Sequence, residues 1–580
     1  MKQFNRRTFV GSATAAVVAA SSPVRLTASG APRAGQISSF LDLLRFPDRV
    51  AAYTADSKDR IELTRNAILW QASSIEFRTS PRPQTLDLIL SAPTAQLTRI
   101  HLRWNLKVST TSLVLGDAWE RSYGDLAWRS IVPERPLPWY FATHDAGVTH
   151  GYGVKTGASA FCFWQLDTHG ISLWLDVRNG GSGVLLGQRE LNAASIVTHQ
   201  GRPGEPTHAS IAALCRKMCP APRLPTGPVY GSNDWYYAYG NNSAEGILRD
   251  TDLLVALAPK GGARPFSVID AGWAGSGTES DVLLHNPKFP DMPGLAAEIR
   301  RRGALPGIWI RPTEAPKAMQ QNLLLPLSRF LSSANSDSEP VYDPTIPEAF
   351  QAILAKVTQV VDWNYDLVKH DYSTFDLFGQ WGFQMGPLLT RPGWSFDNRT
   401  LTNAEIVLNL YKGIRLAAGA RTIILGCNTV GHLAAGLFEL QRTGDDTSGQ
   451  HWERTRRMGV NTLAFRLPQN GTFFINDADC VGITKDIPWE LNRQWLDLIA
   501  RSGSALFLSP SPDAIGPEQK AAIAEAFAIT AAGNSAGQPN DWLANTAPEH
   551  WQFQTGTSHT AVEKSYNWCG SEGCDPYSIS

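Results

Sequence analysis

Hydrophobic and polar positions alternate along the first third of the chain. In residues 100–106 every second side chain is apolar, and residues 159–166 and 171–177 repeat the pattern between Gly- and Asn-rich turns. Because successive side chains of a strand point to opposite faces, this period of two predicts antiparallel strands with one buried face. We therefore expect residues 35–222 to form an N-terminal antiparallel β-sandwich domain that ends in a helix at 209–218.

After a Pro-rich linker the pattern changes to short apolar runs that alternate with amphipathic segments. The runs predicted as strands are residues 229–232, 266–269, 307–310, 365–368, 422–425, 462–465, 472–475 and 505–508. The segments predicted as helices are residues 295–302, 347–361, 403–418, 488–503 and 517–532. Eight strands alternating with helices predict a central (β/α)8 TIM barrel over residues 223–532, although a doubly wound sheet shows the same alternation. We expect residues 533–580 to form a short C-terminal β region. Taken together, the three regions predict a multidomain α/β fold class.

Polar or aromatic residues follow most of the predicted strands. They are Asn233, Asp234, Trp235, Asp270, Trp273, Arg311, Lys369, Asp371, Cys427, Asn428, Asn476, Asp477 and Asp479. Catalytic side chains contributed by the carboxyl ends of many strands are typical of barrel enzymes, and this favours the barrel over the doubly wound sheet. The alternative is that these residues only form caps and turns, where Asp and Asn are also frequent.

The fourth predicted strand ends in two charged residues that are costly to bury without a partner. Lys369 and Asp371 follow the apolar run 365–368 and lie two positions apart, so they point to the same side of an extended chain. A cation at Lys369 would hold Asp371 ionised, as a carboxylate nucleophile requires. The alternative is a structural ion pair between Lys369 and Asp371.

A second pair of carboxylates, Asp445 and Asp446, precedes the sixth predicted strand. Because like charges repel, one of these adjacent groups could keep its proton and serve as an acid. Two carboxylates about 5 Å apart across a barrel mouth suit double displacement at a sugar carbon, whereas a gap of about 9 Å indicates inversion. The alternative is that Asp446 or Thr447 caps the following helix.

Composition narrows the classes of partner. The net charge of -1, from 52 basic and 53 acidic residues, gives no electrostatic case for binding nucleic acid or an anionic membrane. No run after the N-terminus is long and apolar enough to span a bilayer. The 19 Trp residues favour carbohydrate, because indole rings pack on apolar sugar faces, although Trp residues also fill cores.

The seven Cys residues do not form a disulfide framework for a chain of this size. Cys215 and Cys219 are one close pair, and Cys569 and Cys574 are another, so either pair could oxidise after export. Neither pair has His at metal-ligand spacing, and we expect no zinc site.

The N-terminus predicts export. Arg6 and Arg7 precede a weakly apolar run at residues 12–20, and small residues at 28–31 suit cleavage by a peptidase. This order resembles a bacterial twin-arginine signal, which we assign to residues 1–34 and exclude from the fold. The mature protein is then expected to be periplasmic or extracellular; the alternative is a disordered basic tail.

Five motifs occur in the order expected of one enzyme family. They are residues 268–273 (VIDAGW), 365–371 (YDLVKHD), 442–446 (RTGDD), 476–479 (NDAD) and 505–509 (ALFLS). Together they resemble the α-galactosidase clan of retaining glycoside hydrolases, families 36 and 27 and more distantly family 31. The N-terminal β domain is more similar to family 36.

The resemblance implies a role for each matching residue. Asp371 would be the nucleophile and Asp445 the acid/base, with Asp446 in that role if the register is shifted by one. Lys369 would donate to a ring hydroxyl, and Arg442 would bind a hydroxyl or orient Asp445. The other residues implied to bind the non-reducing sugar are Asp234, Trp235, Asp270, Trp273, Trp309 and Arg311. The resemblance implies no metal and no cofactor.

Three positions depart from the family pattern. Ala271 replaces the second acidic residue of the first motif, Tyr372 replaces a cysteine that often follows the nucleophile motif, and Arg311 stands where family 36 tends to have an acidic residue. Since buried hydrogen-bond partners dominate discrimination between sugars, these changes bear on the sugar more than on the reaction.

We therefore expect an exported retaining α-glycosidase, with α-galactosidase as the first choice and an oligosaccharide or glycoside as its substrate. Alternatives within catalysis are a hydrolase or transglycosidase for an α-glucoside, an α-N-acetylgalactosaminide or a β-L-arabinopyranoside. The alternative from another class is a non-catalytic carbohydrate-binding protein on a decayed barrel. The sequence does not fix the oligomeric state.

Overall fold

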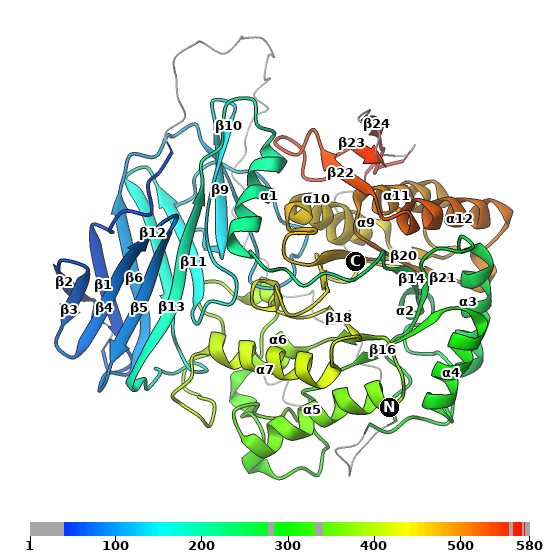
Figure 1. Ribbon diagram of the computed structural model, residues 1–580, viewed down its shortest axis with the longest axis horizontal. Helices are drawn as coiled ribbons and strands as arrows, with labels where there is room; N and C mark the ends of the chain where they lie inside the picture. Colours follow the sequence, from blue (N-terminus) through cyan, green and yellow to red (C-terminus); the bar gives the residue numbers. More distant parts are fainter. Residues whose placement is uncertain are drawn as a thin grey trace.

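A computed structural model describes residues 40–57, 59–275, 283–330, 340–555, 561–570 and 573–574. In chain order these residues form a large antiparallel sheet, a closed parallel barrel and a small C-terminal sheet (Figure 1). The fold class expected from the sequence is confirmed. The expected signal segment, residues 1–34, lies outside the described residues.

The N-terminal sheet has thirteen strands in the order β7-β9-β10-β13-β5-β4-β3-β2-β1-β6-β12-β11-β8. Their bounds are β1 Arg49–Thr54, β2 Ile61–Asn66, β3 Leu69–Ala72, β4 Ile75–Arg82, β5 Thr85–Ala92, β6 Leu97–Asn105, β7 Leu113–Gly116, β8 Leu137–Pro138, β9 Tyr140–Asp145, β10 Val148–Val154, β11 Phe161–Asp167, β12 Gly170–Asp176 and β13 Gly187–His199. The sheet folds over so that strands far apart in this order meet. The ring centroids of Phe141 on β9 and Trp164 on β11 lie 5.5 Å apart. This contact closes an aromatic core between the two halves, as in a sandwich.

Helix α1 (Thr207–Met218) packs on β10 and leads from this sheet to the barrel (Figure 1). The eight barrel strands are β14 Tyr230–Asn233, β15 Phe266–Ile269, β16 Leu305–Ile310, β17 Leu367–His370, β18 Ile423–Gly426, β19 Leu440–Arg442, β20 Ile475–Ile483 and β21 Ala505–Pro510. All neighbours are parallel, and β21 closes the barrel by pairing with β14.

The apolar residues of the barrel strands divide between two cores. Phe266, Leu367, Leu425 and Phe507 belong to a cluster that fills the lumen. Residues next to them in sequence, such as Val368, belong to the larger core that includes the surrounding helices. Since both sides of each strand are buried, the strands appear in the sequence as continuous apolar runs rather than as alternating patterns.

The described barrel region has eleven α-helices, and the sequence predicts five of them, namely α4, α5, α7, α11 and α12. Their bounds are α2 Trp235–Ala238, α3 Ala244–Leu257, α4 Met292–Arg302, α5 Pro347–Asp362, α6 Ser373–Phe378, α7 Asn403–Ala418, α8 Gly431–Ala434, α9 Trp452–Thr455, α10 Thr462–Arg466, α11 Trp489–Ser502 and α12 Pro517–Ala531. Helix α7 begins where Thr402 and Glu405 form a capping box. Helix α4 ends at Gly303, whose φ of 111° favours glycine.

The sequence prediction of the sixth strand was wrong. Residues 462–465 form helix α10, at the end of a continuous helical stretch that starts with α9 and includes a π-helical turn, Arg456–Asn461. A short buried apolar run looks the same in a helix and in a strand. The sixth strand is β19, Leu440–Arg442, which the pattern hides because two of its three residues are polar.

The seventh strand begins where the predicted one ends, because only Ile475 of the predicted residues 472–475 lies in β20 (Ile475–Ile483). Residues 476–479, expected as a turn after it, lie inside β20, where the register shifts between Asp477 and Cys480 and Asp479 has a φ of 71°. Acidic residues argue against a strand unless their charges are balanced. Here Arg442 balances them, with Nη2 lying 2.6 Å from Oδ2 of Asp479.

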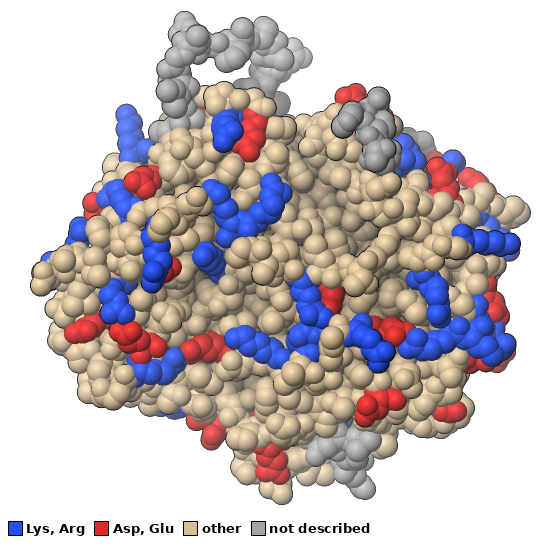
Figure 2. Space-filling view, in the orientation of Figure 1, with Lys and Arg blue, Asp and Glu red and all other residues tan. Residues whose placement is uncertain are grey.

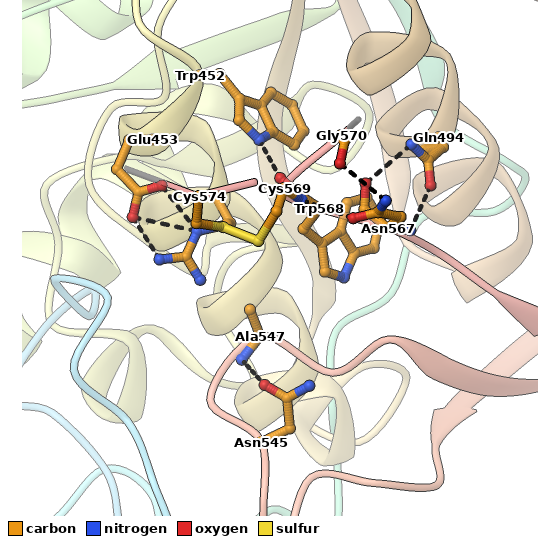
Figure 3. Close-up of a disulfide and its surroundings, with 11 residues drawn as sticks. Trp452, Glu453, Gln494, Asn545, Ala547, Asn567, Trp568, Cys569, Gly570 and Cys574 are labelled. Atoms are coloured by element: carbon orange, nitrogen blue, oxygen red, sulfur yellow. Dashed lines mark hydrogen bonds and ion pairs between the residues drawn. A yellow bond between two sulfur atoms is a disulfide. The ribbon is translucent and has the colours of Figure 1, made fainter. Parts of the chain in front are cut away.

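The C-terminal sheet consists of β22 Ser535–Pro539, β23 His550–Thr555 and β24 Val562–Ser565, and β22 packs on α11. A disulfide joins Cys569 to Cys574, one of the two pairs singled out in the sequence, whereas Cys215 and Cys219 are buried thiols. The disulfide lies next to Trp452, whose indole donates to the carbonyl of Trp568 (Figure 3). The C-terminal segment is thus attached to the start of α9.

Basic and acidic side chains are interspersed on the face of the molecule that Figure 2 shows, with a band of Lys and Arg crossing the barrel side. Among the described residues, none of the helices combines the length and the apolar character needed to cross a bilayer.

Candidate active site

The carboxyl end of β17 presents Lys369 and Asp371 on the inner side of the barrel and His370 on the outer side, as the period of two predicts. The His370 ring lies against Tyr411 and Phe438, at centroid distances of 5.9 and 5.8 Å. Burial lowers the pKa of His370 to about 4. His370 is therefore a neutral packing residue, and the chemistry of this strand is carried by its two neighbours.

Asp371 is held by two donors at the barrel mouth. The residue is only 2% exposed. Oδ2 accepts from Nε1 of Trp309 on β16 at 3.0 Å, and Oδ1 accepts from the backbone N of Tyr372 at 2.8 Å. Tyr372 has a φ of 69°, a conformation that costs a non-glycine residue energy. The turn after β17 thus fixes the direction of the carboxylate.

Lys369 pairs with Asp270 at the end of β15, not with Asp371. Its Nζ lies 2.6 Å from Oδ2 of Asp270, and both side chains are buried. Burial by itself lowers the pKa of Lys369, but Asp270 outweighs it and raises the pKa well above its ordinary value. The alternative of a structural Lys369–Asp371 ion pair is therefore wrong, because the partner of Lys369 comes from β15, two strands away in the barrel.

Asp234, at the end of β14, supports Asp270 from behind. Its Oδ1 accepts from the backbone N of Asp270 at 2.7 Å, and its Oδ2 accepts from Asn242 at 2.6 Å. Burial, followed by the charge of Asp270, raises the pKa of Asp234 to about 7. Asn233 also donates to Asp270. The carboxylate of Asp270 is thus oriented by Asn233 on β14, by Lys369 on β17 and by the backbone N of Ala271.

The three predicted tryptophans differ in what they can offer a ligand. Trp309 donates to Asp371, and Trp235 is half-buried beside Tyr239 at the start of α2. Trp273 is buried, and its indole donates to the carbonyl of Trp309 at 2.9 Å while its ring meets Trp363, the residue after α5. Trp273 therefore positions Trp309.

Arg311, after β16, binds Asp376 of α6 in a two-point contact. Nε and Nη2 lie 2.9 and 2.6 Å from the two carboxylate oxygens, and Thr313 also donates to Asp376. The guanidinium stacks on Tyr372 with its carbon 4.6 Å from the ring centroid. Arg311 thus fixes the ring next to Asp371, and its charge is balanced within the protein.

Arg442 lies at the end of β19 among acidic side chains. Nη2 is 2.6 Å from Asp479 and 3.4 Å from Asp446, and Nη1 donates to the sulfur of Cys427 at 3.4 Å. Asp479 also accepts from the backbone N of Thr447 at 2.8 Å. Through these contacts Arg442 holds the loop that carries the two predicted acid/base candidates.

Asp445 is held by two arginines from different parts of the chain. Its Oδ1 is 2.7 Å from Nη2 of Arg121, and its Oδ2 is 2.8 Å from Nη2 of Arg454 on α9. Arg121 is 2% exposed and Arg454 30% exposed. Burial by itself lowers the pKa of Arg121, but Asp445 raises it well above its ordinary value. Asp446 is closer to Arg442 and lies 3.6 Å from Arg121.

Arg121 belongs to the N-terminal domain, in the segment between β7 and β8. Ser122 donates its backbone N to the carbonyl of Thr443 and accepts from the backbone N of Asp445, both at 2.9 Å. These two bonds form an isolated parallel bridge between Ser122 and Gly444, so residue 122 lies alongside the loop that follows β19. The backbone of the N-terminal domain therefore sets the position of Asp445.

Sequence reasoning missed Arg121 and Arg454, and it did not link Cys427, which follows β18, to Arg442. Arg454 carried one signal, because it follows Asp445 by nine residues in a helical segment. Arg121 carried none, since neither periodicity nor a motif links residue 121 to residue 445. The burial of a charged side chain is visible only in the folded chain.

No protein-family model matches the sequence. Among solved structures, the chain is similar to TtGalA, an α-galactosidase from Thermus thermophilus in complex with p-nitrophenyl α-D-galactopyranoside. The TM-score is 0.57 at 17% identity, over 85% of this chain and 97% of that chain. TtGalA in complex with stachyose gives a TM-score of 0.56 at 17% identity, over 78% and 96%.

A variant of the GH36 α-galactosidase AgaA from Geobacillus stearothermophilus, in complex with 1-deoxygalactonojirimycin, gives a TM-score of 0.56. The identity is 12%, over 87% of this chain and 74% of that chain. Both proteins are α-galactosidases, and this chain shares their architecture across most of its length. The chain therefore has the fold of the α-galactosidase clan of glycoside hydrolases.

Proposed function

We propose that this chain is a retaining α-glycosidase, with terminal α-galactosides as its first substrate class. The observation that carries the proposal is the pair of carboxylates, Asp371 after β17 and Asp445 after β19, each held by two donors at one end of the barrel. Strands β17 and β19 are separated by one strand, β18, so both carboxylates border the same mouth. The similar solved structures support this choice of reaction.

In the first step, an oxygen of Asp371 bonds to the anomeric carbon while the bond to the leaving oxygen breaks and Asp445 gives that oxygen a proton. In the second step, Asp445 takes a proton from water, and the water oxygen displaces Asp371 from the same carbon. Two displacements return the original configuration. The donors on Asp371 keep it in line with the carbon, so little reorganisation accompanies attack.

Arg454 affects the first step of the reaction, because it occupies Oδ2 of Asp445. In this proposal the leaving oxygen of the substrate replaces Arg454 at Oδ2, while the buried Arg121 keeps its contact with Oδ1. Arg454, whose side chain is partly exposed, can turn toward solvent at a lower cost than the buried Arg121. The two arginines thus have different roles.

The non-reducing sugar is assigned to the polar group formed by Asp270 and Lys369, with Trp235 and Trp309 beside it. Two features make the choice of sugar the open part of the proposal. Ala271 offers no side-chain acceptor, and Arg311 already binds Asp376. An α-glucoside, an α-N-acetylgalactosaminide or a β-L-arabinopyranoside, or transfer to an acceptor sugar, remains compatible with the same pair of carboxylates. Export through the signal at residues 1–34 to the periplasm or the medium is part of the proposal.

The test is a panel of 4-nitrophenyl glycosides that covers these sugars in both anomeric forms. The proposal expects release of 4-nitrophenol from α-galactoside above all others, and proton NMR of the first product should show the α anomer. Turnover of another α-linked sugar would change the sugar only. A first product whose anomeric configuration is opposite to that of the substrate, or sugar binding by calorimetry without turnover over days, would overturn the proposed reaction.

Arg121→Ala should lower kcat/KM for a methyl glycoside by about 10- to 100-fold, because a small displacement of a catalytic group has effects of that size. The loss should be larger for a methyl glycoside than for a dinitrophenyl glycoside, since only the former needs a proton from Asp445. Arg129→Ala, an exposed arginine in the same segment, is the control and should match wild type. A folded Arg121→Ala variant with equal losses on both substrates would contradict a positioning role.

A further inference from the structure

An aromatic group lies at the barrel mouth, between the N-terminal domain and the segment that joins α6 to α7. Phe383, in the short helix Gly382–Gln384 between α6 and α7, is 58% exposed. Its ring centroid lies 4.9 Å from that of Tyr123 in the N-terminal domain. Next to it, Trp381 stacks on Phe375 at 4.3 Å. A single exposed apolar residue needs no explanation, but a contiguous aromatic group does.

The support of this group is rigid. The backbone N of Gly382 donates to Oε1 of Glu120 at 2.9 Å, and a Cβ at Gly382 would overlap the Glu120 side chain. Glu120 is buried and also accepts from Tyr123 and Asn428. Phe383 therefore lies on a loop that is fixed between the two domains. Its exposed ring has a defined position before any ligand binds.

The aromatic group borders both carboxylates. Tyr372 follows Asp371 directly and meets the Trp381 ring at a centroid distance of 5.7 Å. The guanidinium carbon of Arg121 lies 5.5 Å from the Trp381 ring, and Arg121 binds Asp445. An acid must stand beside the oxygen that leaves, so the region next to the contacts of Asp445 is where the leaving group lies.

We propose that Trp381 and Phe383, with Tyr123, form the binding subsite for the leaving group, and that this subsite takes a group with a flat apolar ring face. Two sources share that chemistry, an aryl group and the apolar face of a second sugar ring. The inference rests on the proposed function, because it assumes that a bond to a leaving group is broken at this mouth. It adds the chemistry of the part that departs.

The test compares three substrates with the same non-reducing sugar. They are 4-nitrophenyl α-D-galactopyranoside, methyl α-D-galactopyranoside and the disaccharide α-D-galactopyranosyl-(1→6)-D-glucose. For Phe383→Ala we expect the ratio of kcat/KM between the 4-nitrophenyl and the methyl compound to fall by about 3- to 10-fold, through KM. A similar fall in the ratio of kcat/KM between the disaccharide and the methyl compound would show that the subsite also binds the apolar face of a second sugar ring. Leu388→Ala, an exposed apolar residue in the same loop, should leave every ratio unchanged.

An unchanged ratio for both ring-bearing substrates in Phe383→Ala would overturn the subsite. Failure of the proposed function is distinguishable, because wild type would then turn over none of the three. In that case the subsite is read from quenching of tryptophan fluorescence by 4-nitrophenyl α-D-galactopyranoside. Weaker quenching in Phe383→Ala than in Leu388→Ala supports the subsite, and equal quenching overturns it.

Discussion

Asp371→Ala is expected to reduce turnover of a 4-nitrophenyl α-galactoside by a factor on the order of 10⁵, the size of effect seen when a nucleophile is removed. Loss of the side chain also removes the acceptor of Trp309, but the buried cation Lys369 keeps its partner Asp270. The variant should therefore fold. Thermal unfolding and kcat, measured on the same sample, check both statements.

Azide makes this result specific to the nucleophile. In the cavity left by Asp371→Ala, azide can attack the anomeric carbon directly, and a single displacement gives the inverted glycosyl azide. Asp362→Ala, an exposed carboxylate at the end of α5 just before β17, should keep wild-type kcat and form no azide product. Substantial turnover by Asp371→Ala without azide would refute the assignment.

The fold could be predicted from the sequence wherever burial and periodicity agree. Helix α7 lies where its capping residues and apolar face place it, and β17 follows from an apolar run that is too short for a helix. Strand β19 could not be predicted, because Gln441 and Arg442 are buried through hydrogen bonds and ion pairs rather than through apolar contacts. A local pattern of hydrophobic and polar residues does not indicate which distant side chains will form these hydrogen bonds and ion pairs.

The same limit applies to the site. That Lys369 and Asp371 share a side follows from strand geometry, and the carboxyl ends of the strands follow from the barrel. The pairing of Lys369 with Asp270 depends on closure of the barrel, which brings β15 and β17 together at the mouth. The contact of Arg121 with Asp445 depends on docking of two domains, which no local pattern contains.

The charged groups at the mouth explain why this docking matters. Lys369, Arg121 and Arg442 are all buried, and each faces at least one carboxylate. Buried ion pairs of this kind contribute little net stability, because the loss of hydration offsets the attraction. Their value lies in orientation, since each carboxylate at the mouth has a fixed direction before substrate arrives.

Asp445→Ala is expected to show a loss that depends on the leaving group. For a methyl or sugar leaving group, kcat/KM should fall by about 10²- to 10⁴-fold, the usual contribution of a general acid. For a dinitrophenyl group, which leaves without a proton, the first step should be nearly unaffected and the glycosyl-enzyme should accumulate, because no base activates water. A burst of dinitrophenol followed by slow turnover is the measurement.

Asp446→Ala is the matched comparison, because the two carboxylates are adjacent and both lie near Arg121. Azide should speed the second step in Asp445→Ala and give the glycosyl azide with retained configuration, opposite to the product of Asp371→Ala. If Asp446→Ala shows the leaving-group dependence and the retained azide while Asp445→Ala does not, the acid/base role passes to Asp446. If neither variant shows them, the reaction does not proceed by double displacement with an acid on this loop.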